Sequence, residues 1–112
     1  MTHDRLTRAR QMYESFARGD RDVIEATVAE DFRFSSPADV DLDRAGYFER
    51  CWPGAGKGQR FEFVRMVQDG DEVIVTYEMT HSDGSRGRNT EVLTFDGDRI
   101  RRAEVYFGWN IE

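Results

Sequence analysis

Alternation of apolar and polar residues is clearest over residues 89–109, which read NTEVLTFDGDRIRRAEVYFGW. Two alternating runs flank Asp96-Gly97-Asp98, and this combination predicts a β-hairpin. A three-residue loop would pair Phe95 with Arg99, Leu93 with Arg101 and Glu91 with Ala103. This register gathers Leu93, Phe95, Val105, Phe107 and Trp109 on one surface. The carboxylate of Glu91 would then lie on a mostly apolar face.

Helical and strand periodicities alternate along the rest of the chain. Apolar spacing of the helical kind predicts helices over residues 4–18, 20–29 and 44–52, with Gly19 ending the first and Asp20 capping the second. Strict alternation predicts strands over residues 32–36, 59–68 and 72–81, the first ended by Pro37 and lying at an edge. Helices gathered first and strands gathered last indicate one α+β domain, residues 1–112, with helices on one face of an antiparallel sheet.

The strand over residues 72–81 is predicted to bring further candidate site residues close to the hairpin. Tyr77 and His81 share one of its faces, and a five-residue loop would set Tyr77 beside Glu91. His81, Tyr77 and Glu91 would then form a cluster in one cavity. A solvated histidine at the rim is the alternative for His81, and a rim carboxylate paired with Arg88 or bonded to Tyr77 is the alternative for Glu91.

The opposite face of the predicted sheet is not fully polar. Apolar side chains project there among charged ones, a mixture that is common at homodimer interfaces. The apolar members are Val64, Met66, Ile74, Val92 and Tyr106. We therefore expect a homodimer formed through the sheet.

Composition narrows the classes of partner. A formal charge of −6, with arginines interleaved among acids, disfavours nucleic acid, because phosphate binding needs clustered positive charge. The one cysteine, Cys51, excludes an internal disulfide and fits a reducing compartment, so we expect a cytoplasmic protein. No apolar run resembles a signal peptide or a membrane span, and we expect no membrane association.

Three strings resemble the nuclear transport factor 2-like superfamily, and within it the SnoaL-like and ketosteroid isomerase-like proteins. They are YESFARGDRDVIEATVAEDFRFSSP, RAGYFERCWPG and LTFDGDRIRRAEVYFGWNI, in this order and over nearly the whole chain. The resemblance implies a curved sheet wrapped by helices into a cone, an apolar pocket between them, and often a dimer. It does not imply one activity, because this fold hosts isomerases, cyclases, hydrolases, binding proteins and transport adaptors.

Comparison with the ketosteroid isomerases, residue by residue, leaves one of their three roles in place. The position of their general-base aspartate, just before a proline, is Ser36 here, and the position of their oxyanion tyrosine is Met12, beside Tyr13. Their second oxyanion acid corresponds to Glu91, where an acid is retained. A serine hydroxyl does not abstract a carbon-bound proton without an activating base, so steroid isomerisation by that mechanism is not expected.

The candidate site combines these residues. Burial of Glu91 would raise its pKa and make it a neutral hydrogen-bond donor or general acid, with His81 or a loop aspartate, Asp39, Asp41 or Asp43, as base. Predicted ligand contacts are Tyr77, Trp109, Trp52, Phe107, Ser36 and Tyr13, although about half of the aromatic candidates would be plain core. No metal or cofactor is expected, because the metal-binding, phosphate-binding and nucleophile spacings are absent from the sequence.

Three functions fit these sequence features. The first is a SnoaL-like pocket protein that binds a small, largely apolar organic ligand. The second is a cofactor-independent isomerase, cyclase or hydrolase that uses Glu91 as general acid. The third is a dimeric interaction module whose cavity is filled by its own side chains.

Overall fold

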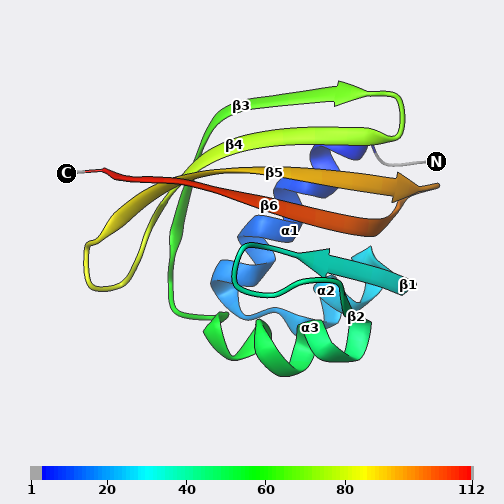
Figure 1. Ribbon diagram of the computed structural model, residues 1–112, viewed down its shortest axis with the longest axis horizontal. Coiled ribbons are helices and arrows are strands. Elements are labelled where there is room, and N and C mark those ends of the chain that lie inside the picture. Colours follow the sequence, from blue (N-terminus) through cyan, green and yellow to red (C-terminus); the bar gives the residue numbers. More distant parts are fainter. Residues whose placement is uncertain (1–3, 112) are drawn as a thin grey trace.

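The computed structural model describes residues 4–111 and has the predicted α+β architecture. Its elements are α1 (Arg5–Arg18), α2 (Arg21–Thr27), β1 (Val28–Ser35), β2 (Leu42–Asp43), α3 (Arg44–Arg50), the 3-10 helix η1 (Trp52–Gly54), β3 (Arg60–Asp69), β4 (Glu72–Thr80), β5 (Arg86–Asp96) and β6 (Arg99–Ile111). Three helices pack on one face of a curved six-stranded sheet with strand order β2-β1-β6-β5-β4-β3 (Figure 1). No helix within residues 4–111 is long and apolar enough to cross a membrane.

Aspartate side chains begin each of the three α-helices. Asp4, Asp20 and Asp43 accept hydrogen bonds from the backbone N–H groups of Leu6, Val23 and Gly46, respectively, which satisfies donors that the first helical turn leaves free. Gly19 ends α1 with a φ of 76°, a left-handed conformation that glycine adopts without steric cost. These caps fix the helix starts close to where the sequence predicts them.

The first strand differs from the prediction. β1 begins at Val28, so the second helix ends earlier than expected, and β1 lies inside the sheet rather than at its edge. It runs parallel to β6, with Val28 opposite Ile100 and Phe34 opposite Ala103, while the short β2 pairs on its other side. Pairing with a strand from the far end of the chain extends β1 beyond its local pattern.

The β5–β6 hairpin keeps Leu93, Phe95 and Val105 on the predicted face, but its register differs and Trp109 does not share that face. A two-residue turn, Gly97 and Asp98, pairs Phe95 with Ile100, and a bulge then shifts the pairing so that Leu93 lies opposite Ala103. The bulge adds one residue to β6, so Ile100 and Ala103 both lie on the buried face and the two arginines between them are exposed. Glu91 lies opposite Val105, on the face predicted for it, although not opposite Ala103.

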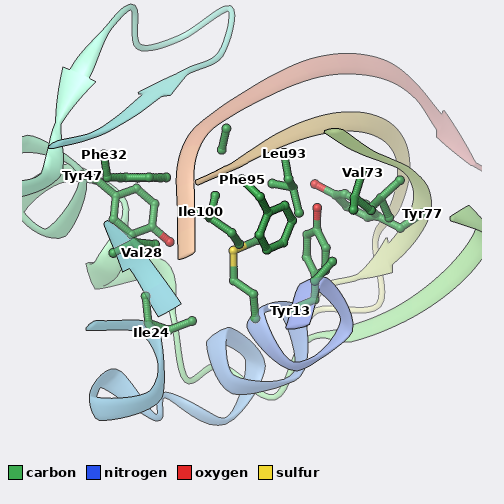
Figure 2. Close-up of a cluster of buried hydrophobic side chains, with 14 of the residues drawn as sticks. Tyr13, Ile24, Val28, Phe32, Tyr47, Val73, Tyr77, Leu93, Phe95 and Ile100 are labelled. Carbon is green, nitrogen blue, oxygen red and sulfur yellow. The ribbon is translucent and has the colours of Figure 1, made fainter. Parts of the chain in front are cut away.

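The core lies between the helices and the concave face of the sheet (Figure 2). Its largest fully buried apolar side chains are Phe32, Ile24, Leu93 and Ile100, from β1, α2, β5 and β6. Full burial of each such side chain contributes about 1.5–3 kcal/mol relative to exposure. Because they come from elements far apart in the sequence, they hold the helices on the sheet.

One arginine fastens α1 to the end of the sheet. The guanidinium of Arg5 donates to the carbonyl oxygen of Gly97 at 2.9 and 3.1 Å, to that of Gly70 at 3.1 Å and to the carboxylate of Asp71 at 3.0 Å. Gly70 and Asp71 belong to the β3–β4 turn, and Gly97 belongs to the β5–β6 turn. Arg5 therefore connects two hairpin turns to the start of α1.

The outer face of the sheet carries the expected mixture of apolar and charged residues, with one exchange. A bulge in β3 after Phe63 turns Met66 toward Val75 and the core, so the prediction for Met66 is wrong. Val67 replaces it, half exposed and opposite Ile74. The extra residue of the bulge reverses the faces of the strand beyond it.

Candidate functional site

A cavity of about 280 Å³ opens between the helices and the concave face of the sheet. Its lining comes from α1 (Met12, Tyr13 and Phe16), β1 and the following loop (Phe34, Ser36, Ala38 and Asp39), α3 and its end (Tyr47 and Cys51), and the sheet (Phe61, Tyr77, Met79, Asn89, Glu91, Val105 and Phe107). The predicted alternative of a cavity filled by the protein's own side chains is therefore wrong.

Glu91 is the buried carboxyl of this cavity, with 5% of its surface exposed. β5 carries it on the concave face, between the positions of Asn89 and Leu93. The hydroxyl of Tyr77 donates to Oε1 of Glu91 at 3.1 Å. Burial raises the pKa of Glu91 to about 7, and the hydroxyl groups of Tyr77 and Tyr13 act in the opposite direction. Near neutral pH this carboxyl therefore exists in both protonation states.

Tyr13 brings a second polar group to the same region. Its ring lies 5.2 Å from the ring of Tyr77 and 5.4 Å from that of Phe61, and Figure 2 shows the hydroxyls of Tyr13 and Tyr77 close to each other. The Tyr13 hydroxyl is buried beside the Glu91 carboxyl, whose pKa it lowers, but it completes no well-formed hydrogen bond within residues 4–111. Burial, followed by the charge of Glu91, raises the pKa of Tyr13, so its hydroxyl keeps its proton. A buried hydroxyl whose hydrogen bonding is incomplete is costly and is available to a ligand.

Asn89 links this carboxyl site to a bulge in β6. The backbone N–H of Gly108 donates to Oδ1 of Asn89 at 3.3 Å, and Nδ2 of Asn89 lies 3.5 Å from the Tyr77 hydroxyl. The pairing of β5 with β6 shifts between Gly87 and Asn89, which places Gly108 directly against the backbone of Arg88. A Cβ at Gly108 would lie 2.1 Å from the Arg88 carbonyl oxygen, so only glycine fits there.

The loop after β1 forms the rim of the cavity. The hydroxyl of Ser36 accepts from the backbone N–H of Asp39 at 3.2 Å, and the Asp39 carboxylate binds Nε of Arg50 at 2.6 Å. Burial raises the pKa of the Cys51 thiol to about 11, and the nearby Asp39 carboxylate adds to this effect. Cys51 is therefore a protonated thiol at neutral pH and is a poor nucleophile.

Five of the predicted site residues line this cavity. They are Glu91, Tyr77, Tyr13, Ser36 and Phe107. Tyr77 lies opposite Asn89 rather than opposite Glu91, because the strands pair two residues away from the predicted register. A shift of two residues keeps the face unchanged, so the Tyr77 side chain still reaches Glu91 diagonally.

The other three predicted residues lie away from the cavity lining. His81 is exposed in the β4–β5 turn, where its backbone bonds to Ser85 and Gly84. Trp52 packs edge-to-face on Phe16, with ring centroids 5.9 Å apart. Trp109 follows the Gly108 bulge and is 65% exposed, beside the guanidinium of Arg88. The structure therefore does not bring together the predicted cluster of His81, Tyr77 and Glu91.

The sequence alone did not assign Asn89 and Cys51 to the site, and it gave Asp39 only as one of three loop aspartates. Asn89 precedes Glu91 by two positions on the same strand, so the strand period alone places both on one face. The positions of Cys51 and Asp39 depend on how α3 and the loop fold over the cavity. Within residues 4–111, no group of three or more His, Cys, Asp or Glu side chains could hold a metal ion.

The curved sheet wrapped by helices is the fold of the nuclear transport factor 2-like, or cystatin-like, proteins. The SnoaL-like domain model matches residues 9–103. The chain therefore belongs to the SnoaL-like domain family. A comparison with functionally curated proteins gave no match.

Solved structures show the same fold at low sequence identity. A proposed ketosteroid isomerase from Kribbella flavida is similar with a TM-score of 0.80 and 20% identity, over 96% of this chain and 80% of that chain. A proposed polyketide cyclase from Acidithiobacillus ferrooxidans gives 0.74 and 22%, over 94% and 89%. An LEH-like epoxide hydrolase from M. tuberculosis gives 0.75 and 16%, over 93% and 78%. Several other neighbours are of unknown function.

Proposed function

We propose that this protein binds a small, largely apolar organic molecule in the cavity, with a polar atom of the ligand at Glu91. The observation that carries the proposal is the buried Glu91 carboxyl beside the Tyr13 hydroxyl, which completes no well-formed hydrogen bond within residues 4–111, in a lining that is otherwise mostly apolar. Apolar walls with a few convergent polar groups are the usual form of a small-molecule site.

The volume limits the size of this ligand. A dry protein cavity of about 150 Å³ accommodates benzene. A cavity of about 280 Å³ therefore has room for a compound of one or two rings. The rings of Tyr13, Phe61 and Tyr77, already packed together at 5.2 to 5.4 Å, offer aromatic surfaces to such a molecule.

The test is a thermal-shift screen of one- and two-ring ketones, phenols, alcohols and hydrocarbons. A ligand at a hundred times its dissociation constant adds about 2.7 kcal/mol to the free energy of unfolding. The stabilisation should be reduced by Glu91→Gln and retained by Glu78→Gln, the same substitution on the outer face of the sheet. Absence of stabilisation by every class of compound, or equal stabilisation of both variants, contradicts the proposal.

Catalysis is the second candidate, favoured by the pKa of Glu91 near 7, which suits a general acid at neutral pH. Cofactor-independent isomerisation, cyclisation or hydrolysis would also need a base. Asp39 lines the cavity, whereas His81 is exposed in a turn outside it, so Asp39 is the better candidate. Loss of turnover in Glu91→Gln with binding retained would indicate catalysis, and loss of affinity alone would indicate recognition.

We also propose that two copies associate through the outer face of the sheet. Val64, Val67 and Tyr106 are 39%, 51% and 55% exposed there, among Ile74 and Val92. Analytical ultracentrifugation at micromolar concentration should give a dimer mass, and Tyr106→Asp should give a monomer. A monomer mass for the unsubstituted protein contradicts this proposal.

A further inference from the structure

The hydrogen-bond chain from the β6 bulge to Glu91 has a fixed direction. A backbone N–H only donates, so the Asn89 atom 3.3 Å from the Gly108 nitrogen is the amide oxygen. The amide nitrogen of Asn89 therefore faces the Tyr77 oxygen, 3.5 Å away. An amide nitrogen also only donates, so the Tyr77 oxygen accepts there. The single hydroxyl proton of Tyr77 is then directed to Oε1 of Glu91, at 3.1 Å.

We propose that Asn89 is a positioning residue that fixes Tyr77 as a donor to Oε1 of Glu91 and thereby keeps the proton of the neutral carboxyl on Oε2. Asn89 is itself held by the bulge at Gly108, where the close approach of the Arg88 carbonyl oxygen admits only glycine. Without Asn89, the Tyr77 hydroxyl could rotate and accept a proton from Glu91 instead. Hydroxyl groups turn freely toward whichever partner is available.

The direction of these hydrogen bonds determines which ligand groups Glu91 can bind. This consequence rests on the proposed function. Neutral Glu91 offers a donor at Oε2, so it favours a ligand with an acceptor oxygen such as a ketone. Ionised Glu91 offers only acceptors, so it favours a ligand hydroxyl that can donate. The same ring skeleton should therefore be preferred as ketone at low pH and as alcohol at high pH.

The other titratable groups that face Glu91 do not account for this pH-dependent preference between ketone and alcohol. Tyr13 from α1, Tyr47 from α3 and Tyr77 from β4 face the carboxyl, and burial raises the pKa of all three phenols. They remain protonated throughout the neutral range. Val105 of β6 lies opposite Glu91 and is apolar, and Asp39 at the cavity rim is paired with Arg50.

The first test measures the pKa of Glu91 by carbon-13 NMR in the full chain without ligand. Asn89→Leu should raise this pKa by about 0.5 to 1 pH unit, because the donated hydrogen bond that favours the ionised carboxyl is weakened. Asn89→Asp should raise it further, because the new carboxylate accepts the Tyr77 proton and repels a second negative charge. Asn89→Ala replaces the leucine variant if the latter does not fold.

The matched control is Thr90→Val on the opposite face of β5, where the Thr90 hydroxyl lies 2.9 Å from that of Thr76. It should leave the pKa of Glu91 unchanged. Equal pKa values in the unsubstituted protein and both Asn89 variants overturn the positioning role, as does a lowered pKa in either variant.

The second test compares 1-indanone with 1-indanol by calorimetry at pH 5.5 and pH 8.5. The ratio of ketone to alcohol affinity should fall about tenfold between these values, the worth of one hydrogen bond. In Asn89→Leu the midpoint of this change should move to higher pH with the pKa of Glu91. Binding of both compounds with a constant ratio overturns the inference about the ligand and leaves the proposed pocket intact. If neither compound binds, the proposed function fails for ligands of this size, and the NMR titration alone decides the role of Asn89.

Discussion

Replacement of Glu91 by glutamine should change how the stability of the protein depends on pH. In the unfolded chain this carboxyl ionises near its ordinary pKa of 4.5, whereas burial holds the folded value at about 7. Between these values the folded protein retains a proton that the unfolded chain has released. Stability therefore falls as pH rises from 4.5 to 7, and the full penalty persists above 7.

The magnitude follows from the gap between the two pKa values. One pH unit of difference corresponds to about 1.4 kcal/mol, so a pKa of about 7 against 4.5 gives about 3.5 kcal/mol over the whole titration. Glutamine is nearly isosteric with the neutral acid, can still accept from Tyr77 and does not titrate. The free energy of unfolding of the unsubstituted protein, minus that of Glu91→Gln, should fall by about 3 kcal/mol between pH 4.5 and pH 8.

The measurement is urea unfolding followed by circular dichroism at five pH values across this range. Subtraction of the two proteins cancels the groups that titrate alike in both. Glu78→Gln is the control, because hydrogen bonds from Arg88 and Arg86 lower the pKa of Glu78. The free energy of unfolding of the unsubstituted protein should exceed that of Glu78→Gln above pH 4.5. This excess should decline as the solution is acidified, which is the opposite trend. A difference for Glu91→Gln that is constant or increases with pH would contradict the raised pKa of Glu91.

Three further substitutions test the architecture around the cavity. Arg5→Ala should lower the free energy of unfolding by about 1–2 kcal/mol in urea titrations, because charge-assisted bonds to two turns are lost, and Arg5→Lys should recover only part of this loss. Full recovery by lysine would show that charge alone matters. Gly108→Ala should cost at least about 2 kcal/mol because its Cβ would lie 2.1 Å from a carbonyl oxygen, whereas Gly87→Ala, whose nearest atoms are at 3.9 Å, should be close to neutral. Equal effects of the two alanines would disprove the tight approach at the bulge. Phe107→Ala should weaken binding of any cavity ligand in calorimetry, and Trp109→Ala should not, since Phe107 lines the cavity and Trp109 lies outside the lining. Weaker binding by Trp109→Ala would place that ring in the site.

Local pattern predicted most of the fold because each element repeats a simple period. The aspartate caps and Gly19 marked helix ends through local hydrogen bonding, which needs no partner from elsewhere in the chain. The start of β1 at Val28 could not be predicted in this way. Residues around it gain strand geometry only by pairing with Ile100 and its neighbours in β6.

The candidate site was predictable where a period of two held and unpredictable where a bulge interrupted it. Glu91, Tyr77 and Phe107 lie on the expected face because each belongs to a regularly paired stretch of its strand. Trp109 follows the bulge, so its side chain lies beside Arg88 instead of in the cavity. A glycine inside a strand is the only local signal of such a bulge, and it does not specify which residue turns over.

The parallel pairing of β1 with β6 determines when the cavity can form during folding. Val28 and Ile100 are neighbours in the sheet although most of the chain lies between them in the sequence. Contacts of such long range impose a large loop-closure cost and form slowly in small domains. On a ribosome, β1 must wait without its main partner until β6 emerges, and only then do the walls contributed by α1, β1 and β6 enclose a common space. A chain shortened before β6 would lose Val105 and Phe107 and leave β5 as an open edge, exposed to association with other chains.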